Sequence, residues 1–289
     1  MARKKSGRCH WRSLGIQMKI AEGRVQLAAS DVDNFLACQR LTQLDLLRAQ
    51  GELRPPREFD IGFQELVRRG EVHERAVLER FRADGLDVVE ISAAEDGAGA
   101  TAEAIRDSVG VVYQGTLTGG PGAALFGRPD FLIRADLLPA PDGEPRPDRD
   151  HYEVVDARLA RSAKARAVLQ TSFYSHLLAE MQGIEPRWMR LALGDGEFAS
   201  FKVNDFAAYE RQTRRLLEAA IGEDPAPEVY PEPVEHCAIC RWRDMCRDRR
   251  RTDGDISLVA GMTTGQRRAL KGDGISTRRG SRGWLTCRG

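Results

Sequence analysis

The spacing of apolar side chains predicts a series of amphipathic helices separated by short strands. In residues 61–83, Phe63, Leu66, Leu78 and Phe81 recur at the intervals of one helix face, and Gly85 marks the end of that helix. The same criteria, with polar N-caps where they occur, predict further helices at about 30–47, 99–108, 162–181, 205–220 and 264–270.

Between the helices, apolar segments bounded by glycine and proline predict strands. They lie at 86–91, 111–117, 124–138 with a break at 127–129, 151–160, and in a hairpin at 187–203. Helices and strands in this order favour an α/β fold with a mixed central sheet flanked by helices.

The composition is that of a soluble globular protein, with 42% hydrophobic and 30% charged residues in a chain of 289. This length suffices for one large domain or two small ones. The chain has no apolar run long enough for a membrane span, and its basic N-terminus lacks the apolar core of a secretory signal. Six cysteines in such a chain indicate reduced thiols, so we expect a cytoplasmic protein.

Arginines are concentrated in RWRDMCRDRRR at 241–251, although the net charge is only +1. A basic segment of this kind suits a polyphosphate partner such as nucleic acid. A solvated, arginine-rich helix end explains the same residues equally well.

Three cysteines are clustered in HCAICRWRDMC, and a fourth lies far upstream on the predicted helix at 30–47. Three local thiolates and one distant thiolate are typical of a metal site that joins the start of a domain to its end. The predicted ligands are Cys38, Cys237, Cys240 and Cys246. A zinc site with three cysteines and His236 is the alternative. Cys9 and Cys287 lie in the tails and are expected to be unliganded.

Two aspartates lie at strand-like segments, Asp130 in GRPDFLIR and Asp156 in YEVVDARLA. Side chains alternate along a strand, so Asp156 and Arg158 share a face. Hard oxygen ligands of this kind suit Mg²⁺ or Mn²⁺, and His73 could add a nitrogen ligand. Taken singly, the same residues also fit a turn aspartate and an exposed helix histidine.

The ordered segments GEVHERAV, GRPDFL, YEVVDAR and QTSFY resemble the motif set of the RecB-like branch of the PD-(D/E)XK nuclease superfamily. The cysteine pattern resembles that of the iron–sulfur members of this branch. The resemblance covers residues 29–250 and implies a restriction-endonuclease-like core, with the N- and C-terminal segments joined by a four-cysteine metal cluster.

The resemblance also implies roles for individual residues. The divalent cation would bind His73, Asp130, Asp156 and the backbone carbonyl of Ala157, while Gln170 and Tyr174 would brace the site and contact nucleic acid. The four predicted cysteine ligands would hold a structural [4Fe–4S] cluster. Glu153 points to the opposite face from Asp156 and would be structural or support the site from outside the metal ligands.

One position departs from the family pattern, because Arg158 stands where the family has lysine. An arginine stays protonated and can stabilise negative charge, but it cannot act as a base. Lys164, at the start of the following helix, could reach back into the site. The resemblance therefore implies the fold more firmly than it implies activity.

The resemblance divides the chain into a flexible basic lead-in at 1–28, a nuclease domain at 29–250, and a partial helix–hairpin–helix-like segment with a polar tail at 251–289. Relatives continue into further domains, so we expect a truncated or frame-altered product. The expected partners are DNA and a helicase or additional domain that is missing from this chain.

The function implied by the resemblance is metal-dependent DNA cleavage at single-stranded or duplex ends in repair or recombination. A catalytically impaired nucleic-acid-binding module on the same fold is one alternative, and a zinc-binding interaction protein is another.

Overall fold

The computed structural model describes residues 17–21, 23–54, 61–92, 96–141, 151–222 and 227–279. The chain forms two compact units. Unit 1 comprises Met1–Asp33 and Asp60–Ala219, and unit 2 comprises Asn34–Phe59 and Ala220–Gly289. These boundaries differ from the expected domain at 29–250, because residues 34–59 group with the C-terminal part of the chain.

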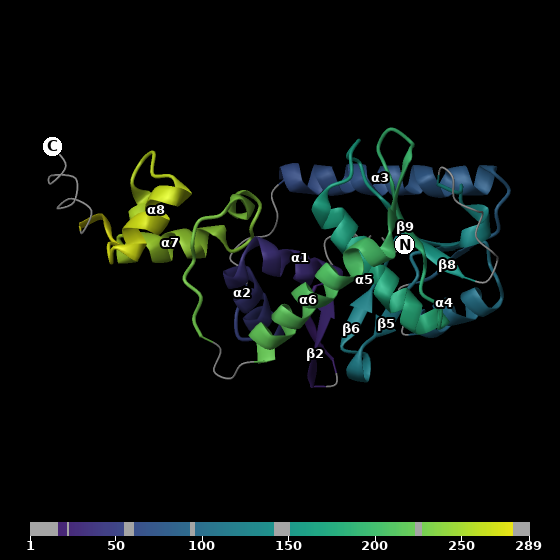
Figure 1. The fold of residues 1–289 in the computed structure, drawn as a ribbon, viewed down its shortest axis with the longest axis horizontal. Coiled ribbons are helices and arrows are strands. Elements are labelled where there is room, and N and C mark those ends of the chain that lie inside the picture. Colours follow the sequence, from purple (N-terminus) through teal and green to yellow (C-terminus); the bar gives the residue numbers. More distant parts are fainter. Residues whose placement is uncertain are drawn as a thin grey trace, which may run out of the picture. The chain divides into compact units, whose positions relative to one another are not determined.

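A six-stranded mixed sheet forms the centre of unit 1 (Figure 1), with the strand order β10-β9-β8-β7-β4-β3. The pairs β3–β4 and β8–β9 are parallel and the others are antiparallel. Its strands are β3 (Val88–Glu90), β4 (Val111–Tyr113), β7 (Phe131–Arg134), β8 (Tyr152–Ala157), β9 (Trp188–Ala192) and β10 (Phe198–Lys202). The predicted α/β class with a mixed sheet and the hairpin at 187–203 are confirmed.

A second sheet in unit 1 has the order β1-β2-β6-β5. Its strands are β1 (Lys19–Ala21), β2 (Arg24–Ala28), β5 (Leu117–Gly119) and β6 (Leu125–Gly127). Within the expected flexible lead-in, residues 19–21 and 24–28 instead pair as strands, while residues 1–16 and 22 lie outside the described part of the chain. The single strand expected at 111–117 is also wrong, because the backbone of Gln114 is left-handed, with φ 56°, and separates β4 from β5.

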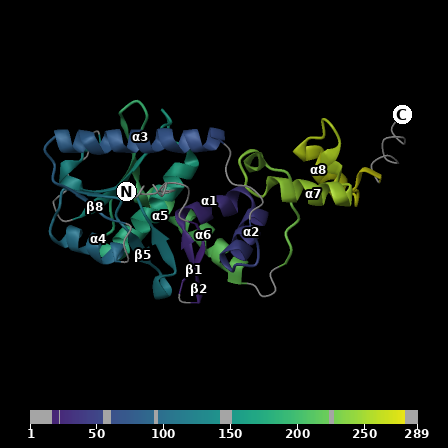
Figure 2. The same cartoon turned by 180° about the vertical axis from the view of Figure 1, so that it is seen from behind.

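Helices cover both faces of the six-stranded sheet (Figures 1 and 2). The helix α3 (Ile61–Ala83) matches its predicted range and packs on one face. The other face carries α5 (Ala165–Gln182) and the start of α6 (Val203–Gly222), and α4 (Gly97–Arg106) contacts α5. Short 3₁₀ turns lie at η1 (Pro121–Ala123) and η2 (Ala135–Leu137).

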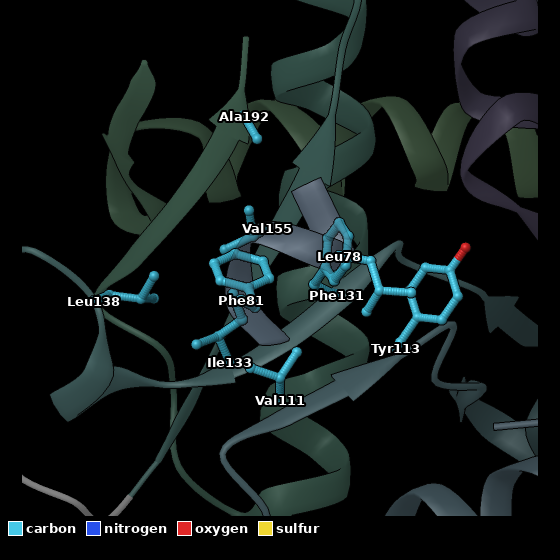
Figure 3. Close-up of a cluster of buried hydrophobic side chains, with 9 residues drawn as sticks. All are labelled: Leu78, Phe81, Val111, Tyr113, Phe131, Ile133, Leu138, Val155 and Ala192. Carbon is cyan, nitrogen blue, oxygen red and sulfur yellow. The ribbon is translucent and has the colours of Figure 1, made fainter. Parts of the chain in front are cut away.

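The hydrophobic core beneath α3 determines which face of the sheet each strand side chain lies on (Figure 3). Leu78 and Phe81 of α3 pack on Phe131 and Val155, and the rings of Phe81 and Phe131 lie 5.3 Å apart in an edge-to-face arrangement. Because side chains alternate along a strand, Asp156, next to Val155, lies on the opposite face of the sheet. Burial of Val155 beneath α3 therefore places the Asp156 side chain on the other face of the sheet.

Unit 2 is mainly helical. Its elements are α2 (Gln39–Ala49), η3 (Glu235–Ala238), α7 (Arg243–Asp253), η4 (Ile256–Leu258), α8 (Thr264–Gly272) and the C-terminal part of α1 (Ala29–Ala37). Its core contains Leu41, Leu44 and the fully buried Trp242, whose indole N–H donates to Asp45 Oδ1 at 2.9 Å. The predicted helix at 264–270 is confirmed by α8, which begins with a capping box between Thr263 and Gln266.

The single helix expected at 30–47 is wrong, because it is interrupted at Cys38. That residue has an extended backbone, with φ −167° and ψ 107°, and it is the N-cap of α2. Periodicity continues across such a break and does not reveal it. None of the helices within the described ranges combines the length and apolarity that crossing a bilayer requires.

Candidate functional site

The two predicted aspartates face each other at one edge of the six-stranded sheet. Asp130 precedes β7 and Asp156 lies near the end of β8, and these strands are antiparallel, with Phe131 opposite Val155. The backbone N–H of Asp130 donates to Asp156 Oδ1 at 3.2 Å, and the backbone N–H of Ala157 donates to Asp130 Oδ2 at 2.8 Å. The register of the sheet therefore holds the two carboxylates together.

These aspartates open into a cavity of about 240 Å³ between α3 and α5, here called the carboxylate cavity. Six of the residues predicted from the sequence line it: Asp130, Asp156, Ala157, Arg158, Gln170 and Tyr174. They come from strands and from a helix that are distant in the sequence, so the fold alone brings them together.

His73 is the predicted ligand that the structure does not place in the carboxylate cavity. Its Nε2 lies 3.2 Å from the backbone O of Ala192, to which it can donate. The neighbouring Glu74 lines the cavity instead. Consecutive residues on a helix point about 100° apart, so one step along α3 exchanges an imidazole for a carboxylate. The sequence does not decide between them, because His73 is spaced from Val77 as Glu74 is spaced from Leu78.

The cavity concentrates negative charge away from water. Burial raises the pKa of Asp130 well above its usual range, and the nearby Asp156 and Glu74 carboxylates raise it further. Burial also raises the pKa of Glu74, although hydrogen bonds from Tyr113 and Gln114 oppose this. A cation in the cavity would relieve both effects, because an opposite charge favours the ionised carboxylate.

Arg158 is the cation that faces these carboxylates. Its Nη2 lies 2.5 Å from Asp156 Oδ2. Burial lowers the pKa of its guanidinium, but Asp156 and Asp130 outweigh this and raise it overall. Arg158 therefore remains charged and pairs with Asp156. Lys164 does not line the carboxylate cavity, but contributes to a second one near the start of α5.

Gln114 is a site residue that the sequence analysis missed. Its amide donates to Glu74 Oε1 and lies 3.5 Å from Asp130 Oδ1. The guanidinium of Arg128 donates to the backbone O of Gln114 at 3.0 Å and to that of Ile91 at 2.8 Å. The left-handed backbone of Gln114 is rare for a residue with a side chain, and such conformations are common at functional sites. No local sequence pattern identifies it.

The side chains that α5 contributes to the carboxylate cavity, Gln170 and Tyr174, are neutral. The Gln170 amide donates to the Tyr174 hydroxyl at 2.8 Å, and burial raises the pKa of Tyr174, so its phenol stays protonated. Glu153, on the opposite face of β8, is fully buried and pairs with Arg190, with Nε 3.0 Å from Oε2. This agrees with the structural role expected for Glu153.

A Gly127→Ala variant is expected to disturb Tyr174 without touching the carboxylates. A Cβ at this position of β6 would lie 2.6 Å from Cδ1 and 2.8 Å from Cε1 of the Tyr174 ring, so the ring must shift. Overpacking of this kind costs about 1–3 kcal/mol. Thermal or urea unfolding of the variant measures it, and an unchanged midpoint would show that the ring has room to move. Gly70→Ala on α3, where a Cβ meets open space, is the control and is expected to keep or raise the midpoint, because alanine favours a helix interior.

The oxygen donors of the carboxylate cavity fit a hard divalent cation in part. Within the described ranges, no set of three or more His, Cys, Asp or Glu side chains is arranged to hold a metal ion. Mg²⁺ often binds through one or two carboxylates and completes its shell with waters and substrate phosphate. Asp130 and Asp156 provide the two carboxylates, and Ala157 lies beside them.

The four predicted cysteine ligands line one small cavity within unit 2, together with His236. Cys38, Cys240 and Cys246 pack against Leu41, Leu44 and Trp242. Burial, with smaller contributions from the neighbouring thiols, raises the pKa of Cys240 to about 11. Thiolates so placed need a compensating positive charge. The interruption between α1 and α2 thus places Cys38 in the same cavity as Cys237, Cys240 and Cys246.

Aspartates neutralise much of the arginine-rich segment locally. Arg249 donates to Asp253 at 2.8 Å, Arg247 lies 3.0 Å from Asp244, and Arg250 is buried and donates to the backbone O of Pro231. This pairing favours the helix-end interpretation for these residues over a free basic surface.

Neither a protein-family model nor a curated protein matches this chain. One solved structure, described as the crystal structure of SSO0001, aligns with 76% of this chain and 93% of its own, at 13% sequence identity and a TM-score of 0.30. So weak a likeness establishes neither a shared fold nor a function. The α/β class rests on the structure itself, and the restriction-endonuclease-like core stays a proposal.

Proposed function

We propose that unit 1 is a RecB-like nuclease with a restriction-endonuclease-like core, which hydrolyses phosphodiester bonds of DNA with Mg²⁺ or Mn²⁺ held by Asp130 and Asp156. The supporting observation is the pair of facing carboxylates in a cavity that also presents Arg158, Gln170 and Tyr174. This combination suits an anionic substrate bridged to the protein by a cation. DNA ends in repair or recombination are the proposed substrates.

The residues have separate tasks in this proposal. A bound divalent cation lowers the pKa of a coordinated water and stabilises charge that builds on the phosphate. Asp130 and Asp156 hold the cation, and the sheet fixes their separation. Arg158 adds positive charge beside the site but accepts no proton. Tyr174 stays protonated and can donate a hydrogen bond to a phosphate oxygen.

For unit 2 we propose a structural metal site formed by Cys38, Cys237, Cys240 and Cys246. The shared cavity of the four thiols supports it. A [4Fe–4S] cluster is our first choice and zinc is the alternative, because thiolates bind both. The site would stabilise unit 2 and take no part in hydrolysis.

The proposal for unit 1 is tested by incubating the purified full chain with end-labelled single-stranded and duplex oligonucleotides, with Mn²⁺, with Mg²⁺ or with EDTA. Cation-dependent cleavage that the Asp130→Asn variant lacks supports it. Equal cleavage by the variant and the wild type, or none by either, would overturn it.

A catalytically impaired nucleic-acid-binding module is the second candidate, and the pairing of Arg158 with Asp156 favours it. Arg158→Lys discriminates between the two candidates. A lysine presents a compact ammonium that can orient water, so about tenfold faster cleavage is expected if arginine limits the natural chain. Unchanged cleavage would show that arginine serves as well, and the rate constant on a labelled oligonucleotide decides.

A further inference from the structure

Arg158 lies at the junction of two cavities. Its guanidinium lines the carboxylate cavity, where it pairs with Asp156 at 2.5 Å. It also lines a second cavity of about 210 Å³, here called the Asp33 cavity, to which Lys164 and Arg166 contribute. The second cavity gives the Arg158 side chain a direction in which to move.

Asp33 is a buried carboxylate with one unused oxygen. Its side chain is only 5% exposed. Its Oδ2 lies 3.3 Å from Arg166 Nε, whereas its Oδ1 has no hydrogen-bond partner among the residues that the structure describes. A buried acceptor without a partner is unfavourable and is rare in folded proteins.

The charges of Asp33 and Arg158 already interact across the Asp33 cavity. Burial raises the pKa of Asp33 to about 6, and the guanidiniums of Arg166 and Arg158 oppose that shift. In return, Asp33 is among the groups that raise the pKa of Arg158. Arg158 thus has two carboxylates within electrostatic reach, and only Asp156 is paired with it at present.

A divalent cation and a guanidinium compete for the Asp156 carboxylate. Both are positive, and they repel each other strongly in a buried site. We therefore expect binding of the cation to weaken the pairing of Arg158 with Asp156. The displaced guanidinium then needs another acceptor.

We propose that Asp33 is a positioning residue that receives Arg158 when a divalent cation occupies Asp156. This inference rests on the proposed cation site at Asp130 and Asp156. When the Arg158 guanidinium turns toward Asp33, it donates a hydrogen bond to the buried Oδ1 and leaves the Asp156 carboxylate free for the cation. Cation affinity is then coupled to a carboxylate that lies outside the cation's own ligands.

The test is the Mn²⁺ affinity of the full chain, measured without nucleic acid by calorimetry and by the electron paramagnetic resonance of Mn²⁺. Asp33→Asn, which keeps the volume and removes the charge, is expected to weaken binding about tenfold. Arg158→Gln removes the competitor and is expected to tighten binding about tenfold. Asp33→Glu keeps the charge and is expected to preserve most of the affinity.

The double variant carries the decisive result. In the Arg158→Gln background, Asp33→Asn is expected to change Mn²⁺ affinity less than about twofold, because no guanidinium remains to be received. Arg161→Gln, which removes an exposed charge from the loop that follows Arg158, is the control and is expected to change Mn²⁺ affinity little. A tenfold loss from Asp33→Asn in both backgrounds would reveal only long-range attraction and would overturn the inference.

The inference and the proposed function fail in different ways. If the wild type binds Mn²⁺ no better than Asp130→Asn does, the cation site is wrong and both fail. If Asp130→Asn weakens Mn²⁺ binding but Asp33→Asn does not, the cation site stands and only the role of Asp33 is rejected.

Discussion

Replacing Asp130 by asparagine is expected to reduce cation-dependent cleavage by about 10²–10³-fold, the scale of losing one electrostatic contact to the reacting group. The amide keeps the shape of the side chain and can still accept the N–H of Ala157, which now lies 2.8 Å from Oδ2. It loses the negative charge that a hard cation requires. The measurement is the single-turnover rate on a labelled oligonucleotide with Mn²⁺.

Stability provides the control for this variant. Asp130 is buried among carboxylates, and its folded-state pKa is raised, so its ionised form opposes folding at neutral pH in the absence of a cation. An amide removes that cost, and the unfolding midpoint of the metal-free variant should equal or exceed that of the wild type. A variant that loses activity and also melts early would indicate damage to the fold instead of loss of a ligand.

Asp156→Asn should lose cleavage to a similar extent but behave differently in the unfolding experiment. Asp156 is paired with Arg158, so its replacement leaves a largely buried guanidinium without its closest carboxylate. The two aspartates thus share a proposed role but have opposite electrostatic surroundings. Comparing their midpoints separates ligand loss from the loss of an ion pair.

The order of polar motifs along the sequence located most of the carboxylate cavity. Strand alternation places Asp156 and Arg158 on one face. Gln170 and Tyr174 share a helix face, but only the family resemblance marked them and Asp130 as site residues. The structure brings all five residues to one cavity.

Residues that depend on longer-range packing were not predictable in the same way. Whether His73 or Glu74 faces the cavity depends on the rotation of α3 about its axis, which the packing of Leu78 and Phe81 decides. Gln114 reaches the site through a left-handed backbone between two sheets. Both errors arise because periodicity identifies a helix or strand more reliably than it fixes its ends and rotation.

In unit 2, the sequence pattern again identified side chains but not the backbone conformation around them. The four cysteines expected to share a metal all line one cavity, and the shared metal stays a proposal. The backbone at Cys38 was not anticipated, because a break between two helices leaves the apolar spacing on either side intact. The spacing of the cysteines in the sequence therefore indicates a metal site without revealing the backbone conformation at Cys38.

Cys240→Ser is expected to remove most of the metal from unit 2 and to destabilise it by more than about 4 kcal/mol, the scale associated with the loss of a structural metal. Cys240 is packed beside Trp242, which is fully buried, so unfolding exposes the indole and changes its fluorescence. The measurements are iron, acid-labile sulfide and zinc per chain, followed by unfolding monitored at the tryptophans.

The metal analysis also decides between the two proposed metals. Iron with sulfide in the wild type indicates a cluster, and one zinc per chain without sulfide indicates the alternative site. Cys9→Ser, in a segment expected to be unliganded, is the matched control and should keep both metal and stability. If Cys240→Ser retained the metal and midpoint of the wild type, the four thiols would share a cavity without sharing a metal. Because the proposed hydrolysis takes place in unit 1, a folded unit 1 in this variant should keep its Mn²⁺ affinity even as unit 2 unfolds.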